Sequence, residues 1–228
     1  MRPVDCIVHN AGVMAVPFKE SPDGFETTLQ VNYLSPFLLT ALLLPNLRAA
    51  SKARGAAARV VTVSSGTHRS GDVERDVLRI GAEDIGNAGA PSGSGRRPHS
   101  KWRAYATSKL CGVLFTSELQ RRVPPEEVIA VAVRPGTVRT GISRNSPGLA
   151  LLFGLLDAVG LMTDPEAAAR SVAAAVLRED GQLRPGAYYD RFEVGKASRE
   201  ARNVSLQKLL WDWTADRLRH GRWLPIEG

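Results

Sequence analysis

The sequence predicts an α/β fold built on a parallel sheet. Three short runs rich in β-branched residues, at 4–8, 59–65 and 128–133, have the unbroken apolar character of strands that are buried on both faces. Long helical patterns separate them, one from 23 to 50 and one from 102 to 122. Strand, helix, strand, helix, strand is the order of a parallel sheet with right-handed crossovers.

Composition limits the possible classes of protein. The chain has 228 residues, 43% of them hydrophobic, which is enough to bury one core and predicts one domain over residues 1–228. Its formal charge is +7, but the cations are scattered and no run contains five or more like charges. This pattern predicts a solvated basic surface, so we expect no nucleic-acid partner.

Thiols and apolar segments carry little functional signal. Cys6 and Cys111 belong to no C-x-x-C or Cys/His cluster, which predicts no metal site and indicates a reducing compartment. The first residues lack a basic region followed by an apolar stretch, so we expect no signal peptide in the chain as written. The apolar segments 33–47 and 149–162 are shorter than the roughly 20 residues of a membrane span. We interpret them as buried or lid helices.

Each predicted strand ends in residues that suit one edge of the sheet. The leucine-rich helix over 23–50 is apolar around most of its circumference, which favours a place against a sheet face. The strands end at Asn10-Ala11-Gly12, at Ser65 and at Pro135-Gly136. Carboxyl ends of parallel strands share an edge, where small residues allow a flat cofactor to approach the backbone.

Residues 66–100 interrupt the alternation of strands and helices. They are first charged and then rich in Gly, Ser and Pro over 86–95, which predicts a flexible surface insertion.

The C-terminal part, residues 143–228, follows the third strand. Thr163-Asp164-Pro165-Glu166 has the pattern of a capping box and predicts a helix that runs to about residue 178. A short strand over 187–190 and a helix over 198–219 follow.

Tyr105 and Lys109 are candidates for acid/base chemistry. They lie four residues apart on the predicted helix 102–122, so their side chains leave the same face. An ammonium beside a phenol lowers the phenol pKa from about 10 towards neutrality. Two common residues at this spacing are weak evidence alone, but Ser65 strengthens it because it lies at the carboxyl edge of the sheet.

These residues together resemble the short-chain dehydrogenase/reductase family. The resemblance rests, in order, on Asn10-Ala11-Gly12, Asn32, Val63-Ser64-Ser65, Tyr105-Ala106-Thr107-Ser108-Lys109 and Arg134-Pro135-Gly136. It covers about residues 4–142 and implies a Rossmann-like, doubly wound parallel sheet. Segments 63–68, 105–110 and 113–116 are especially similar to the retinol-dehydrogenase-like branch.

The resemblance also implies roles for individual residues. Tyr105 would be the acid/base and Lys109 would lower its pKa and bind the nicotinamide ribose. Ser65 would hydrogen-bond the substrate oxygen, and Asn32 would hold a helix kink and a water that relays the proton. The residues implied to contact the cofactor, NADP or NAD, are Asn10, Ala11, Gly12, Tyr105, Lys109, Pro135, Gly136, Thr137, Val138 and Thr140.

The sequence also departs from the family's pattern. His9 stands where a second Asn is usual, and the interval from Ser65 to Tyr105 is long. Nothing before Cys6 supplies the glycine-rich turn that follows the family's first strand, and the glycines of 86–95 follow no strand. We therefore expect a domain that is incomplete at its N-terminus and binds dinucleotide weakly as written, with the strand 4–8 at the edge of the sheet.

Two hypotheses about function follow. The first is an oxidoreductase, its N-terminal segment missing, that interconverts an alcohol and a carbonyl on a hydrophobic substrate such as a retinoid, steroid or lipid aldehyde. The second is a short, non-catalytic isoform that acts as a decoy or partner-binding module. Retention of Asn32, Ser65, Tyr105 and Lys109 favours the first. Under the oxidoreductase hypothesis we expect a substrate-binding lid within 143–228 and a homodimer. We also expect a location in the cytoplasm, or on the cytosolic side of a membrane through an upstream segment.

Overall fold

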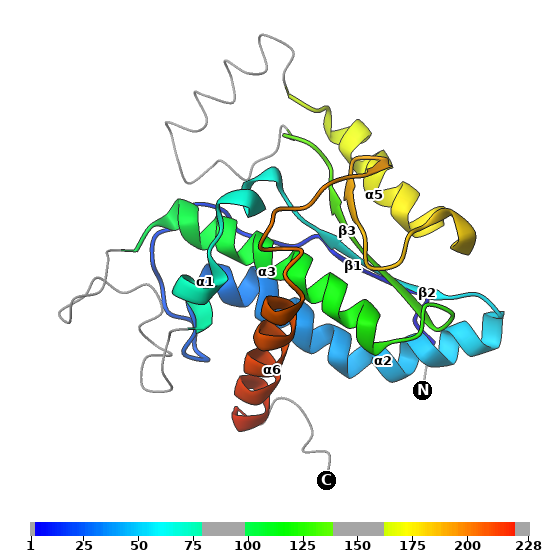
Figure 1. Ribbon diagram of the computed structural model, residues 1–228, viewed down its shortest axis with the longest axis horizontal. Helices are drawn as coiled ribbons and strands as arrows, with labels where there is room; N and C mark the ends of the chain where they lie inside the picture. The colour runs from blue at the N-terminus through cyan, green and yellow to red at the C-terminus, as the bar shows by residue number, and fades with distance from the viewer. Residues whose placement is uncertain (1–2, 79–98, 139–161, 222–228) are drawn as a thin grey trace.

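The computed structural model describes residues 3–78, 99–138 and 162–221. They form a five-stranded sheet in the order β1-β2-β3-β4-β5 (Figure 1). The strands are β1 (Cys6–His9), β2 (Ala58–Val63), β3 (Val128–Arg134), β4 (Tyr188–Asp190) and β5 (Glu193–Val194). The first four are mutually parallel and β5 is antiparallel to β4. The predicted α/β, Rossmann-like class is confirmed, and β1 is an edge strand of the described sheet.

Alternation along the strands divides the sheet into two faces. Val60 and Ala130 point into the larger hydrophobic cluster, whereas Val61 and Val131 point into a smaller one on the opposite side. The helices covering the first face are α2 (Ser35–Arg54), α3 (Lys101–Arg122) and α6 (Val204–His220), with α6 packed on α3 (Figure 1). The opposite face carries α5 (Pro165–Leu177).

A long helix follows β1 and contains a wide turn. It begins as α1 (Thr27–Leu29), widens into the π-helical segment η1 (Gln30–Leu34) and continues as α2. It starts later than the expected residue 23, because the Glu26 carboxylate accepts hydrogen bonds from the first free backbone N–H groups. Residues 27–54 have the length and composition of a membrane span, although 39% of the most apolar window is buried in the protein. That the chain holds no membrane span stays a prediction.

Residues 66–78, which we expected to open a flexible insertion, instead pack against α3. They form the 3₁₀ turn η2 (Gly66–Ser70) and the π-helical turn η3 (Glu74–Leu78). A Cβ on Gly71 would lie 2.8 Å from the carbonyl oxygen of Ala106, so the two backbones touch. Val73 and Val77 are fully buried and anchor this segment in the core. The glycine-rich remainder, 79–98, lies outside the described residues.

Two C-terminal helices begin later than the sequence pattern indicates. The cap of α5 is Asp164 rather than Thr163, because the Asp164 carboxylate accepts from the N–H groups of Glu166 and Ala167. The cap of α6 is Asn203, whose side chain accepts from the Leu206 N–H. Residues 198–203 therefore form turns before α6, where we expected helix.

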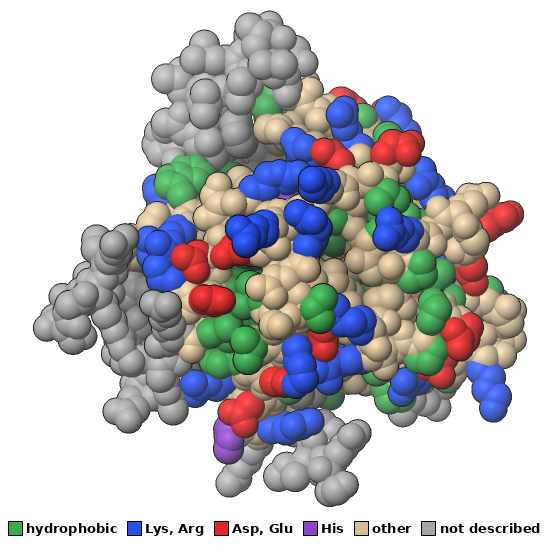
Figure 2. Space-filling model, in the orientation of Figure 1, with side chains coloured by type: hydrophobic (Ala, Val, Ile, Leu, Met, Phe, Trp, Pro, Cys, Tyr) green, Lys and Arg blue, Asp and Glu red, His purple; other side chains and the backbone are tan. Residues whose placement is uncertain are grey.

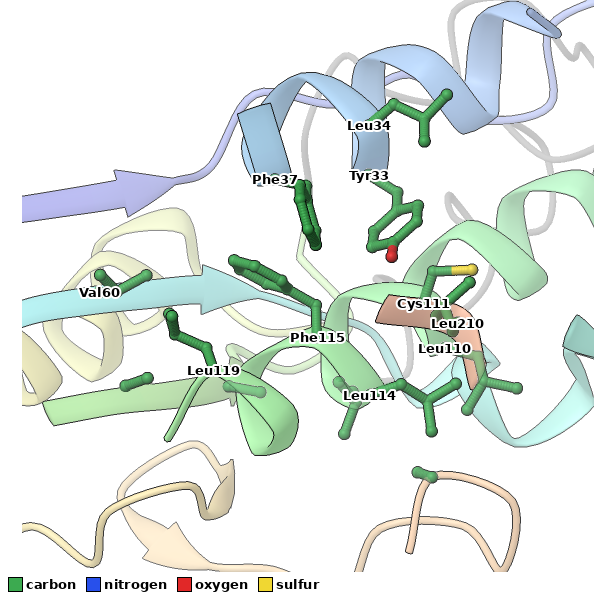
Figure 3. Close-up of a cluster of buried hydrophobic side chains, with 14 of the residues drawn as sticks. Tyr33, Leu34, Phe37, Val60, Leu110, Cys111, Leu114, Phe115, Leu119 and Leu210 are labelled. Carbon is green, nitrogen blue, oxygen red and sulfur yellow. The ribbon is translucent and has the colours of Figure 1, made fainter. Parts of the chain in front are cut away.

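Large apolar side chains fill the space between the sheet and α2, α3 and α6. Figure 3 shows Phe37 and Phe115 directed towards each other, with Leu114 and Leu119 on either side of Phe115. Trp211 of α6 closes the cluster, stacked on Phe115 with ring centroids 5.9 Å apart. Burying each such side chain stabilises the fold by roughly 1.5–3 kcal/mol, so this core fixes the position of α3.

Charged side chains of both signs are spread over the surface. On the face in Figure 2, several Lys and Arg side chains gather across the upper middle, and Asp, Glu and hydrophobic side chains lie around them. Many of the cations are in ion pairs, such as Arg48 with Glu127 and Arg134 with Asp190. The absence of a nucleic-acid partner stays a prediction.

Candidate active site

Helix α3 presents Tyr105 and Lys109 side by side at the carboxyl edge of the sheet. Both are nearly buried, at 6% and 7% exposure. The Lys109 Nζ lies 5.8 Å from the centre of the Tyr105 ring. Ser100 caps the start of α3 by accepting from the Arg103 N–H, which fixes where the first turn begins.

Electrostatics at this pair differ from the expectation that Lys109 lowers the Tyr105 pKa. Burial raises the pKa of Tyr105 above its ordinary value, and a hydrogen bond with Ser65 opposes that shift. The Lys109 ammonium instead donates to the carbonyl oxygen of Val63 at 2.9 Å, the last residue of β2. Burial lowers the pKa of Lys109 to about 8. At Tyr105, desolvation therefore outweighs any stabilisation of phenolate by the ammonium.

Asn32 joins three parts of the site. It lies in η1, and its Oδ1 accepts from the Val13 N–H at 2.8 Å, while its Nδ2 donates to the Val13 carbonyl at 2.9 Å. The same Nδ2 donates to Ser108 Oγ at 2.9 Å, and Ser108 Oγ donates to the Tyr105 carbonyl at 2.8 Å. Ser108, which sequence reasoning gave no role, thus connects Asn32 to α3, the helix that carries Tyr105 and Lys109.

Ser65 follows the end of β2 and caps η2. Its Oγ accepts from the Thr67 N–H at 3.3 Å and also hydrogen-bonds the side chain of Tyr105. Two hydroxyl groups from different elements therefore meet at one point at the carboxyl edge. A substrate oxygen placed there could contact both.

A pocket of about 970 Å³ opens at this edge and continues along α5. Most of its wall is apolar, and the α5 side chains that contribute are Pro165, Ala168, Ala169, Val172, Ala173, Val176 and Leu177. Two cations, Lys109 and Arg134, line it, and no carboxylate is among the described lining residues. The volume and polarity suit a large ligand that carries both an apolar part and negative charge.

Two glycines keep the backbone open beside the pocket. A Cβ on Gly12 would lie 3.1 Å from Asn32 Oδ1, and one on Gly136 would overlap Thr163 Oγ1. Gly136 also has φ +101, which disfavours any other residue. The Thr163 N–H donates to the Thr137 carbonyl at 2.7 Å and ties this loop to the start of α5.

The structure brings together most of the residues that the resemblance implies for a cofactor. Asn10, Gly12, Tyr105, Lys109, Pro135, Gly136, Thr137 and Val138 all line the pocket. Ala11 is exposed and outside the described lining, and Thr140 lies outside the described residues. The small residues, the two cations and the pocket volume fit the nicotinamide end of a dinucleotide. The individual roles stay predictions.

His9 faces away from this pocket. Its Nε2 lies 2.7 Å from Thr40 Oγ1, and the Thr40 hydroxyl donates to the Pro36 carbonyl, so Nε2 carries the hydrogen and donates. The ring also meets Phe115 edge-on. Burial lowers the pKa of His9 to about 4. His9 therefore connects β1 to α2 and is neutral at physiological pH.

Sequence reasoning gave no role to Arg134, and it placed a substrate-binding lid within 143–228 without singling out α5. Arg134 Nη1 donates to Asp190 Oδ2 at 2.7 Å, and its Nε would lie 3.2 Å from a Cβ on Gly66. The apolar positions 168, 172 and 176 of α5 recur at helical spacing, which could have identified this wall.

Comparisons with known proteins agree with this geometry. The family model described as short chain dehydrogenase matches residues 1–75 and 90–148. Retinol dehydrogenase 11 of Homo sapiens is 33% identical over 97% of the chain, and polyprenol dehydrogenase of Homo sapiens is 38% identical over 92%. The chain spans 61% and 59% of the lengths of these two relatives. An uncharacterised protein from Mycobacterium paratuberculosis has a similar structure, with TM-score 0.66 and 29% identity, covering 96% of this chain and 68% of that one.

Proposed function

The chain belongs to the short-chain dehydrogenase/reductase family, and we propose that it takes part in NAD- or NADP-dependent interconversion of an alcohol and a carbonyl on a hydrophobic substrate. The observation that carries this proposal is the meeting of Tyr105 and Ser65 at the carboxyl edge, with Lys109 behind them and the pocket in front.

The side chains have complementary tasks in this proposal. A bound nicotinamide would supply or accept the hydride. The Tyr105 hydroxyl would donate a proton to the substrate oxygen during reduction, and the Tyr105 phenolate would accept the proton of the alcohol during oxidation. The Ser65 hydroxyl would hold that oxygen in place. Lys109 would keep a positive charge beside the phenol, and Asn32 would orient α3 through Ser108.

The walls of the pocket support a large apolar substrate. The described part of α5 contributes only Ala, Val, Leu and Pro side chains to the lining. Relatives named for retinol and for polyprenol act on long apolar alcohols, which agrees with such a wall. We extend the substrate class to this chain as part of the proposal. A homodimer and a location in the cytoplasm or on a cytosolic membrane surface belong to it as well.

The test is hydride transfer by the purified chain. Retinaldehyde and a polyprenyl aldehyde are offered with NADH or NADPH, the corresponding alcohols with NAD or NADP, and the nicotinamide absorbance is followed. Turnover that falls about 10²- to 10⁴-fold in Tyr105→Phe supports the proposal. Tyr33→Phe is the matched control, because Tyr33 is equally buried but bonds Thr214.

The same measurements test the alternative of a non-catalytic module. If the folded chain turns over none of these substrates, even when the cofactor concentration is raised to offset weak dinucleotide binding, the oxidoreductase proposal fails for this chain. The module hypothesis is then favoured. Equal turnover in Tyr105→Phe and the wild type would instead leave an oxidoreductase with the wrong acid/base assigned.

A further inference from the structure

His68 is completely buried behind the turn that carries Ser65, and the chemistry described above does not use it. Its Nδ1 lies 2.7 Å from the Ser65 carbonyl oxygen, and the Ser198 N–H donates to its Nε2 at 3.1 Å. Because Nε2 accepts, the ring is neutral and Nδ1 carries the hydrogen that is donated to Ser65. Burial lowers the pKa of His68, which agrees with a neutral ring.

The bonds of His68 connect segments that are distant in the sequence. Ser198 comes 130 positions after His68 and lies in the turns before α6. The neighbouring Arg69 donates to the Lys196 carbonyl at 2.7 Å, so η2 is tied twice to the same stretch of chain. The ring of Tyr188, in β4, packs against the imidazole with centroids 4.9 Å apart.

Ser65 has few other restraints. It lies beyond the last residue of β2, in extended backbone that no helix or strand includes. Its carbonyl oxygen accepts from the backbone N–H of His68 at 3.2 Å as well as from the imidazole. The imidazole is therefore a side chain that holds the peptide following Ser65, and it holds η2, whose Thr67 N–H donates to the Ser65 Oγ.

We propose that His68 is a positioning residue that aims the Ser65 hydroxyl at the substrate oxygen through its hydrogen bond to the Ser65 carbonyl, while the Ser198 amide holds the imidazole in the tautomer that makes this bond. Ser198 thereby orients the imidazole, and the bond from Nδ1 to the Ser65 carbonyl is the contact that reaches the active site. This inference rests on the proposed function, since it gives His68 a task in the same reaction. A hydroxyl displaced by about 1 Å can cost on the order of 10²-fold in rate, so such a support matters.

Three variants separate positioning from general stability. His68→Asn keeps an N–H donor at the place of Nδ1 and loses the acceptor for Ser198. His68→Leu loses both bonds at similar volume. His9→Leu is the matched control, because it removes another buried imidazole whose partner, Thr40, is not part of the site.

We expect all three variants to melt at lower temperature. Turnover at saturation should fall roughly tenfold in His68→Leu, with KM for the carbonyl substrate changed less than about threefold. It should stay within about threefold of the wild type in His68→Asn and in His9→Leu. Wild-type turnover in His68→Leu, or an equal loss in His68→Asn and His68→Leu, would overturn the proposal.

A second readout needs no activity. Amide hydrogen exchange of residues 67–71 in the ligand-free chain should be about tenfold faster in His68→Leu and unchanged in His68→Asn. Unchanged exchange in His68→Leu would show that the imidazole does not hold the turn. If the wild type turns over no substrate, the proposed function fails, while the exchange rates still decide the role of His68.

Discussion

The two faces of the sheet differ in the size of their buried clusters and in how much space they leave for a ligand. The face under α2, α3 and α6, which we call the packed face, carries the larger cluster of buried side chains, including aromatic rings in contact (Figure 3). The face under α5, which we call the open face, carries a smaller cluster dominated by Val and Ala, and the pocket extends over it. Leu177 at the end of α5 is 80% exposed, whereas Leu114 of α3 is fully buried.

This difference assigns separate tasks to the faces. Tyr105 and Lys109 belong to a helix of the packed face, so a rigid core holds the groups whose geometry must be accurate. The wall offered to the ligand belongs to the open face, where small side chains leave space. Changes on the two faces should therefore have different consequences, and four of them test this.

The largest expected effect is on turnover, through Lys109→Met. Loss of the ammonium beside Tyr105 should reduce turnover by about 10²- to 10⁴-fold. The protein should nevertheless become more stable at pH 7, because the lowered pKa of Lys109, about 8, means that its burial as a charged group opposes folding. After subtracting the lost bond to Val63, we expect a gain of about 1–2 kcal/mol.

Urea denaturation and turnover of the same preparation check this. The unfolded chain binds more protons than the folded one between pH 8 and 10.5, so wild-type stability should rise with pH across that window. Lys109→Met should lack this rise. A less stable Lys109→Met protein would mean that the Lys109 ammonium stabilises the folded state and that its burial does not oppose folding.

The next largest effect is expected on folding stability, from Leu114→Ala on the packed face. Leu114 is 0% exposed and lies in the cluster of Figure 3, so the substitution leaves a cavity and should cost about 3–4 kcal/mol. The measurement is the midpoint of urea denaturation at constant m-value. A loss under about 1 kcal/mol would show that the packed face can collapse around the cavity and is not rigid.

The sequence predicts the parts of the fold that depend on local patterns, and it does not predict the contacts between residues that are far apart in the chain. The strands of β-branched residues, the leucine-rich helix and the Tyr105–Lys109 spacing are local patterns, and the structure confirms these three strands and the two long helices within a few residues. The helix expected over 149–162 lies mostly outside the described residues. The support of Ser65 by His68 depends on Ser198, 130 positions away, which no local pattern indicates. The ion pair of Arg134 with Asp190 is likewise a product of strand pairing between β3 and β4.

A somewhat smaller loss of stability should appear when the pH is lowered, because His9 is buried on the packed face. The pKa of His9 is lowered to about 4 from an ordinary value of 6.5, so the unfolded chain takes up a proton first as the pH falls. Stability that is complete above pH 6.5 should therefore be lost between pH 6.5 and 4, by about 3 kcal/mol. In His9→Gln, which keeps an N–H for Thr40 but does not titrate, this part of the acid loss should disappear. Identical acid profiles for the two proteins would assign the loss to other groups.

The smallest effect is expected on the open face, from Leu177→Ala. Leu177 lines the pocket but is 80% exposed, so truncating it removes little buried area and should change stability by less than about 0.5 kcal/mol. Because its side chain borders the space proposed for the apolar substrate, KM for a long-chain aldehyde should rise about two- to fivefold while turnover at saturation is kept. A short aldehyde that does not reach α5 should show no change in KM. A stability loss as large as that of Leu114→Ala would mean that α5 is packed as tightly as α3. The proposed division between the packed face and the open face would then be wrong.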